Sequence, residues 1–298
     1  MLLYVVAATP ARAVPGSFLL LLFGVGNVAV PWVTVGIQAA IAAVTTKNEG
    51  FVFGVIAPIT EEVMKVLPVI VLYVWKKPLF RYLFGASDWM LCGAAVGSGV
   101  ELWEDVLMRR TPSFPTSAPN LFGVPLIAGY WHESRGVFIG HVASAAFIAL
   151  ALGWARYLKR PSRQRADAAP SSWVAFRASR IFAYAPAALV LFWMMVDHAG
   201  NNLRTEHDWY WAPAHAVYYL SARGRLAAYV FLVAAAATIV IEGVLLTRMP
   251  APRSPAKAGH SSGRRGWLRR LILSHQIRYV QLSMRPAVRL GEPRPTHP

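Results

Sequence analysis

Two adjacent carboxylates and one ammonium group, those of Glu61, Glu62 and Lys65, lie within the largely apolar stretch Phe51–Trp75. On insertion scales each charge at the centre of a membrane helix costs about 2.5–3.5 kcal/mol, so such charges need partners, water or a function. Lys65 follows the glutamates by four and three residues, and both spacings bring side chains together on a helix. Lys65 can therefore neutralise one glutamate and leave the other free to accept a proton. The alternative is a buried ion pair that only fixes helix packing.

Further polar residues that could share this chemistry occur in three later apolar stretches. They are Glu104, His141, and His198 with Asn202 four residues after it. A carboxylate can take a proton from water, and imidazoles and carboxylates can hold a metal ion that activates water. Alternatively, an imidazole and an Asn amide can donate hydrogen bonds to a developing oxyanion. These residue types suit hydrolysis of an amide with or without a metal, although a histidine in a span can also make only a packing hydrogen bond.

The composition predicts that these residues are positioned by membrane helices. Of the 298 residues, 56% are hydrophobic and only 15% are charged, and the mean hydropathy is +0.41. Several apolar runs are long enough to cross a bilayer as helices. We therefore expect an all-α fold, a polytopic transmembrane helix bundle of about six to eight spans. The six clearest are Ser17–Val44, Phe51–Trp75, Asp88–Met108, Gly136–Leu158, Ile181–Leu203 and Arg225–Leu246.

Two parts of different composition are predicted, a transmembrane bundle over residues 1–248 and a basic tail over residues 249–298. The Pro- and Arg-rich tail could be disordered or could form an amphipathic helix that binds anionic lipid headgroups. The basic residues flank apolar runs or fill the tail, so the net charge of +16 indicates topology and lipid binding rather than nucleic acid. The N-terminal segment lacks a basic region before its apolar run, so it is expected to remain uncleaved.

The distribution of Lys and Arg also predicts the orientation of the bundle. Basic residues are concentrated after the second and fourth spans and in the tail, which places both termini in the cytoplasm. At about 1.5 Å per residue, the polar residues of four different spans then fall in the outer half of the membrane. This agreement in depth favours one shared, water-accessible pocket.

The order of these polar residues on successive spans resembles the PrsW family of intramembrane proteases. That family is related to the CAAX prenyl endopeptidases and bacteriocin-processing membrane enzymes. The resemblance covers about residues 50–205 and implies hydrolysis of peptide bonds in membrane protein substrates, in a bacterial-type plasma membrane. The matching motifs are Glu61-Glu62-x-x-Lys65, Glu104, His141 and His198-x-x-x-Asn202.

The resemblance also implies roles for these residues. Either Glu61 or Glu62 would act as general base, with Lys65 holding the other glutamate as a carboxylate. Asn202 would orient His198 or donate to the oxyanion. A second set would bind one divalent metal ion, with zinc the first candidate, or would stabilise the oxyanion if no metal is used; this set is Glu104, His141 and His198.

Four residues depart from the family pattern. Val100, Asp105 and Met108 stand where the third-span motif of the family has Phe, Asn and Tyr, and Ala149 replaces a glycine. Because Glu104 is kept, we expect the acid chemistry to survive while the shape of the pocket differs.

Buried carboxylates and histidines also form ion paths, so the alternative function is a proton- or cation-coupled membrane transporter. The sequence lacks the paired broken helices in two related halves that many transporters have. A membrane scaffold without catalysis, bound to lipid through its tail, is the third hypothesis.

Overall fold

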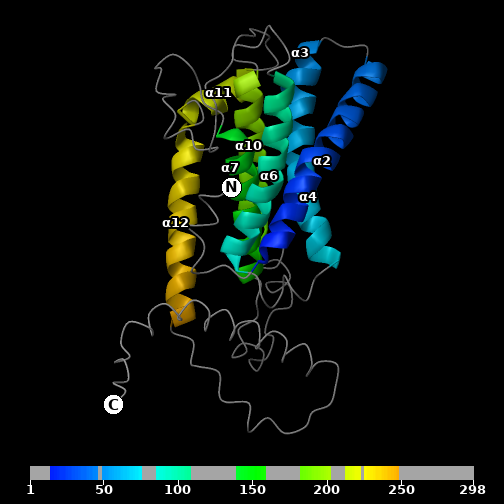
Figure 1. Ribbon diagram of the computed structural model, residues 1–298. Coiled ribbons are helices and arrows are strands. Elements are labelled where there is room, and N and C mark those ends of the chain that lie inside the picture. The colour runs from blue at the N-terminus through cyan, green and yellow to red at the C-terminus, as the bar shows by residue number, and fades with distance from the viewer. Residues whose placement is uncertain are drawn as a thin grey trace, which may run out of the picture. The chain divides into compact units, whose positions relative to one another are not determined.

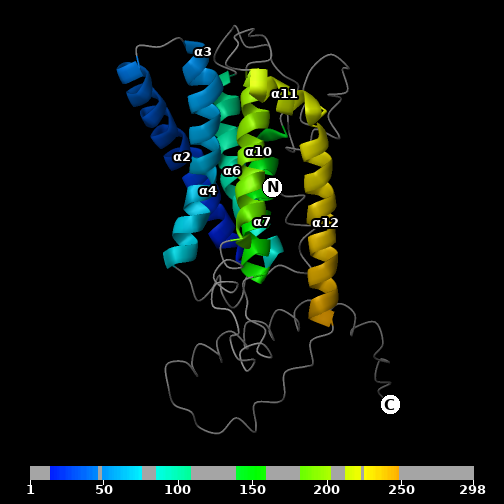
Figure 2. The same ribbon diagram turned by 180° about the vertical axis from the view of Figure 1, so that it is seen from behind.

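The computed structural model describes residues 14–45, 49–75, 85–108, 139–158, 182–202, 212–222 and 225–247. Within these ranges every regular element is a helix, which confirms the all-α prediction (Figures 1 and 2). The helices, in chain order, are α2 (Gly16–Thr45), α3 (Glu49–Phe51), the π-helix η2 (Val52–Ile56), α4 (Ala57–Trp75), α6 (Ala86–Met108), α7 (Gly140–Leu158), α10 (Ala185–Asn202), α11 (Ala212–Leu220) and α12 (Arg225–Thr247).

Two of the described helices are long and apolar enough to cross a membrane by length and composition. They are α2, over Gly16–Thr45, and the part of α12 from Arg225 to Val244. Each of the other four predicted spans also contains a helix, but α4, α6, α7 and α10 carry the polar residues of interest. The prediction of six to eight spans is therefore not confirmed, and the predicted tail lies outside the described residues.

Helix α6 lies against both α2 and α7, and small residues bring the backbones together. A Cβ atom at Gly97 would collide with the backbone carbonyl of His141, and one at Gly93 would collide with that of Ala145. On the opposite side, a Cβ at Gly99 would meet the backbone of α2 at Phe23. Membrane helices often pack through such close contact of small residues. Lipid tails are as apolar as the helices, so hydrophobic burial does not drive the helices together. The start of α7, which carries His141, is thus held at a fixed distance from α6.

The chain enters α4 through the single π-helical turn η2, whose end is marked by a hydrogen bond from the Ala57 N–H to the Val52 carbonyl. Such turns are rare and occur frequently at functional sites. From there α4 buries one face, which includes Glu62, Lys65 and Val69. This face turns toward α6, α7 and α10, while the opposite face of α4 carries exposed apolar side chains.

Helix α12 joins the bundle through long side chains. The indole of Trp154 on α7 donates to Thr238 at 2.8 Å, and the rings of Phe147 and Phe231 lie 5.6 Å apart. The buried carboxylate of Glu242 accepts the backbone N–H groups of Ala86 and Ser87 at 2.5 and 3.1 Å. Glu242 thereby caps the start of α6, where the first N–H groups of a helix have no partner within it.

Candidate active site

The buried charges of α4 form an ion pair. The Nζ atom of Lys65 lies 2.5 Å from Oε1 of Glu62, and both side chains are fully buried. The partner of Lys65 is therefore the glutamate three residues before it. The side chain of Glu61 is 25% exposed.

Lys65 also ties α4 to α7. Its Nζ atom lies 2.8 Å from Nδ1 of His141 and donates to Oγ of Ser144 at 3.1 Å. Because an ammonium group only donates hydrogen bonds, Nδ1 of His141 accepts and the ring proton of His141 is assigned to Nε2. That proton faces Oε2 of Glu104, which is in hydrogen-bond contact with His141 Nε2.

Helix α6 holds His141 at two points. The carboxylate of Glu104 contacts the imidazole, and Oε2 of Glu101 accepts the backbone N–H of His141 at 2.8 Å. Between them, Gly140 has φ +81°, a backbone conformation that favours glycine, and a Cβ atom there would lie 3.4 Å from the Glu101 carboxylate. Both the backbone and the ring of His141 are thus fixed relative to α6.

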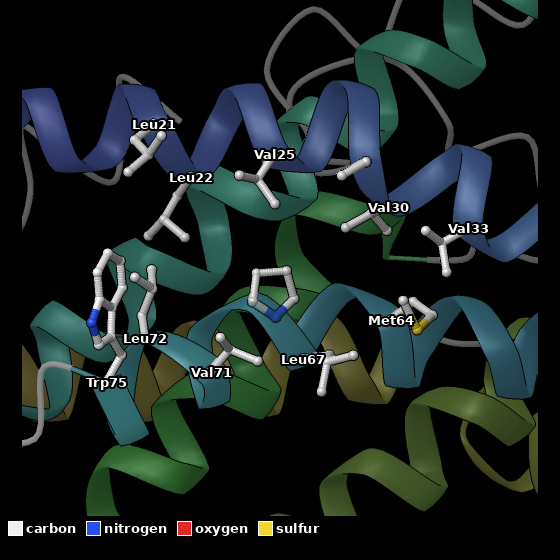
Figure 3. A pocket seen from close by; sticks show the side chains of 12 residues that line it. Leu21, Leu22, Val25, Val30, Val33, Met64, Leu67, Val71, Leu72 and Trp75 are labelled. Atoms are coloured by element: carbon white, nitrogen blue, oxygen red, sulfur yellow. The ribbon is translucent and has the colours of Figure 1, made fainter.

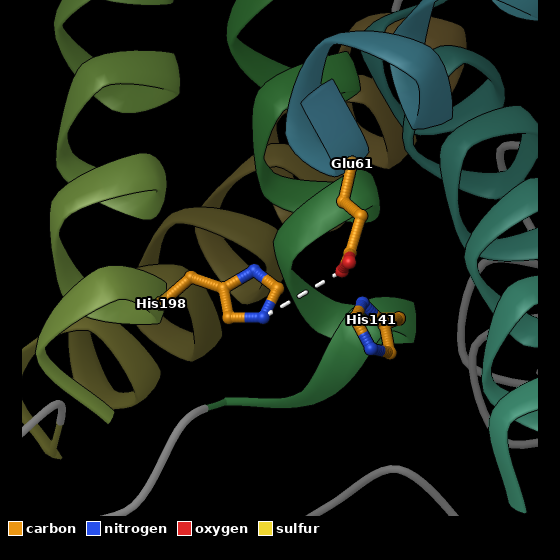
Figure 4. Close-up of side chains that lie close together, drawn as sticks. All are labelled: Glu61, His141 and His198. Carbon is orange, nitrogen blue, oxygen red and sulfur yellow. Dashed lines mark ion pairs between the residues drawn. The ribbon is translucent and has the colours of Figure 1, made fainter. Parts of the chain in front are cut away.

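His198, on α10, contacts both glutamates of α4. Its Nδ1 atom lies 3.0 Å from Oε1 of Glu62. Its Nε2 atom lies 3.6 Å from Oε2 of Glu61 (Figure 4). Since the Glu62 carboxylate is the partner of Nδ1, the proton is assigned to Nδ1 and the lone pair of Nε2 faces Glu61. A carboxylate behind one ring nitrogen fixes the tautomer and orientation of a metal-binding histidine.

The structure brings three possible metal ligands together. One ligand atom from each of Glu61, His141 and His198 lies within 4.8 Å of the others, and Figure 4 shows the three side chains converging from α4, α7 and α10. Two ligands of a tetrahedral zinc ion are about 3.3 Å apart, given zinc–ligand bonds of about 2.0–2.2 Å. The 3.6 Å between His198 Nε2 and Glu61 Oε2 is close to that value. His141 is the third member of the group, and Glu104 contacts its Nε2 atom.

The charges of this region also fit a divalent cation. With neutral imidazoles, Lys65 is the one ammonium that contacts the cluster among the described residues, whereas the cluster includes four carboxylates, those of Glu61, Glu62, Glu101 and Glu104. In addition, Oε2 of Glu62 is buried without a hydrogen-bond partner among the described residues. A buried oxygen of this kind calls for a bound water or ion. The donor set therefore suits a metal of the zinc type, although the residues do not select one metal.

Six of the predicted site residues are joined by hydrogen bonds or ion pairs in this cluster: Glu61, Glu62, Lys65, Glu104, His141 and His198. Asn202 is half-buried in the last turn of α10, four residues after His198. The metal-binding set expected from the sequence was Glu104, His141 and His198. In the structure the group of three is Glu61, His141 and His198, and Glu104 contacts His141. The roles of these residues stay predictions.

Sequence reasoning assigned no role to three residues that contact the cluster, or to the buried Asp197. Ser144 and Glu101 bind Lys65 and the backbone of His141, and Gln38 on α2 donates to Oε1 of Glu61 at 3.4 Å and to Thr60 at 3.2 Å. Asp197, beside His198, accepts a hydrogen bond from Ser221 at 2.7 Å. Ser144 follows His141 by about one helical turn, and Gln38 is one of two amides, with Asn27, in an apolar span, so both residues could have been noticed in the sequence.

Comparison with known families identifies the chain. The family model described as PrsW family intramembrane metalloprotease matches residues 14–189, more than half of the 298 residues. The match includes Glu61, Glu62, Lys65, Glu104 and His141 and ends before His198. Neither the curated proteins nor the solved structures gave a match. The helical fold, its apolar spans and the family match show that this chain is an integral membrane protein that belongs to the PrsW family of intramembrane metalloproteases.

Proposed function

We propose that the chain hydrolyses peptide bonds of membrane proteins with a water molecule activated by Glu62, at a site where Glu61, His141 and His198 hold one divalent metal ion. The observation that carries this proposal is the convergence of those three residues from three helices, with the Glu62 carboxylate directly behind His198. The family match supports proteolysis over the transporter alternative.

The two glutamates would have different tasks. Glu61 is partly exposed and lies in the group of three possible ligands, so it is the better candidate for a metal ligand. Glu62 is fully buried, and its Oε1 atom already accepts from Lys65 and His198. Its other oxygen, Oε2, is free of hydrogen-bond partners among the described residues and is the candidate base.

In the proposed reaction, Oε2 of Glu62 takes a proton from water while the water oxygen bonds to the scissile carbonyl carbon. The same oxygen then returns the proton to the amide nitrogen as the carbon–nitrogen bond breaks, which is the usual double task of such a group. Lys65 supplies the countercharge to Glu62 throughout. The bound metal would act as a Lewis acid on the carbonyl oxygen. Asn202, one turn after His198, is proposed to orient His198 or to donate to the developing oxyanion.

We also propose the predicted topology, with six spans and both termini in the cytoplasm. It would put the cluster in the outer half of the membrane. A reporter fused after Lys159 should read cytoplasmic, and one fused near Trp209 should read external. The opposite pattern would contradict the orientation without affecting the assignment of the cluster.

The proposed function is tested by metal content and peptide cleavage on purified protein in detergent or liposomes. Wild type should contain about one equivalent of metal and should cleave members of a transmembrane peptide library, and a chelator should stop cleavage. His198→Ala should lose the metal. Glu62→Gln, which keeps the size of the side chain, should keep the metal but lose about 10²–10⁴-fold in turnover.

Thr34→Val is the matched control, because among the described residues the Thr34 hydroxyl donates to the Val30 carbonyl of its own helix and contacts no site residue. It removes a buried polar group of α2 and should change neither metal content nor turnover. If no form cleaves any peptide and wild type instead carries a proton or cation flux that Glu62→Gln eliminates, the protease proposal is wrong.

A further inference from the structure

A groove of about 330 Å³ runs between α2 and α4, and every side chain that lines it is apolar (Figure 3). Val33 and Met64 lie at one end of the groove, and Leu21 and Trp75 lie at the other. The α2 residues that line it fall in the interior of Gly16–Thr45, a helix able to cross a membrane. The groove therefore lies at membrane depth and requires an apolar occupant.

The groove ends at the candidate active site. Beyond its Val33 and Met64 end, one to one and a half helical turns further on, Gln38 of α2 donates to Thr60 and Glu61 of α4 at 3.2 and 3.4 Å. These hydrogen bonds join the two helices where the groove ends, and they are long for an N–H donor. Two long hydrogen bonds therefore lie between this end of the groove and Glu61.

Glu61 lies between the groove and the histidines. Its Oε1 atom accepts from Gln38, on the groove side, while its Oε2 atom faces Nε2 of His198. The side chains of Glu62, Lys65, His141 and His198 are almost fully buried, whereas that of Glu61 is 25% exposed. Among these residues, Glu61 is therefore the one that an occupant of the groove would reach first.

We propose that this groove is the docking surface for the transmembrane segment of the protein substrate, which reaches the site by displacing the contact between Gln38 and Glu61. The proposal rests on the proposed function and adds the route of the substrate. A volume of about 330 Å³ is at the small end of ligand pockets and is too narrow for a whole helix of about 10–12 Å diameter. It accommodates a few side chains of a segment that lies along α4.

The polar groups at the end of the groove favour a peptide over a lipid acyl chain. The lining itself is apolar and suits either occupant. The Gln38 amide and the Thr60 hydroxyl follow where the groove ends, next to Glu61. A peptide offers N–H and C=O groups to these side chains, whereas an acyl chain has neither.

Filling the groove tests the proposal. Ala29 lines the groove and is exposed, so Ala29→Trp places a large side chain inside it. Val28, the next residue, is 59% exposed and lies outside the lining, so Val28→Trp is the matched control. The probes are a single-span peptide of about 20 apolar residues that wild type cleaves, and a short water-soluble peptide with the same cleavage sequence. Ala29→Trp should raise the KM for the single-span peptide at least about tenfold, a loss of about 1.4 kcal/mol of binding, and leave the short peptide unchanged.

A second measurement does not depend on turnover. A benzophenone amino acid replaces Val71, in the groove, or Ile70, which is exposed but outside it, in Glu62→Gln protein in liposomes. The single-span peptide should be captured from position 71 and not from position 70. Equal capture at both positions, or capture of lipid alone at position 71, overturns the proposal.

The outcomes separate the groove from the proposed function. If wild type cleaves both peptides and the two tryptophan variants have equal KM for the single-span peptide, the groove proposal is wrong and proteolysis stands. That result would favour entry from the side of Glu104, whose side chain is 37% exposed. If wild type cleaves neither peptide, the proposed function is wrong. The groove proposal is then tested by crosslinking, and capture of the single-span peptide from position 71 but not from position 70 supports it.

Discussion

The contact between α6 and α7 differs from the contact between α2 and α4. The first is made by glycines, and a methyl group added at Gly93 or Gly97 would strike the backbone of α7. The second is made by large apolar side chains that leave a groove. Backbone contact fixes the distance between two helices, whereas side chains can change rotamer. The residues that need fixed geometry lie beside the first contact, and the proposed route for the substrate follows the second.

The largest effect is expected from Lys65→Met, which removes the ammonium group from the buried cluster. Glu62 would be left in the bundle without its countercharge, and breaking a buried ion pair from one side costs about 3–5 kcal/mol. The loss should appear as a lower free energy of unfolding in a detergent–denaturant titration, accompanied by loss of cleavage.

The double variant Lys65→Met with Glu62→Gln is the control for this prediction. It replaces the carboxylate by a neutral amide, so much of the lost stability should return while cleavage stays absent. If the double variant is as unstable as Lys65→Met alone, the ion pair is not what stabilises the contact between α4 and α7.

The next largest effect is expected from Gly97→Ala, which tests the backbone contact beside the site. The added methyl group would meet the His141 carbonyl, and overpacking of this kind typically costs about 1–3 kcal/mol. Because the start of α7 must move, turnover should fall as well. Gly24→Ala is the matched control on α2, since a Cβ atom there meets nothing within 4 Å. Equal stability and turnover for the two variants would show that the contact is not rigid.

A smaller effect on chemistry is expected from Glu104→Ala, which removes the partner of the His141 ring. Loss of a residue that orients a metal ligand typically lowers metal affinity or activity about 10–100-fold. The fold should survive because Glu101 still holds the backbone of His141. Leu102→Ala, at an exposed position on the same helix, is the control and should leave metal affinity unchanged.

Most of the helices and the candidate cluster could be predicted from the sequence, because both depend on local regularity. Apolar runs of spanning length predicted the six long helices, and the spacing of Lys65 placed it within reach of a glutamate. The agreement in depth of the polar residues on four spans indicated a shared pocket before any distance was known. These signals depend on the length of each span and on the position of a residue along it.

Features that depend on how helices face one another could not be predicted. Lys65 is compatible with either glutamate by spacing, and the choice of Glu62 follows from the burial of one face of α4. The groove depends on the angle and rotation of α2 relative to α4, which composition does not encode. Likewise, the sequence shows Gln38 only as a polar residue in an apolar span. Its contact with Glu61, 23 residues away in the sequence, is apparent only from the structure.

The smallest effect on stability is expected from Gln38→Leu, which breaks the contact between α2 and Glu61. A net contribution of about 0.5–1.5 kcal/mol is typical of one hydrogen bond, and these two are long, so stability should change little. Turnover should respond differently for the two peptides. If the contact closes the end of the groove, Gln38→Leu should lower the KM for a single-span peptide severalfold and leave the KM for a short soluble peptide unchanged. Thr34→Val, on the same helix, should change neither value. A rise in both KM values for Gln38→Leu would mean that Gln38 positions Glu61 for catalysis and does not close the groove.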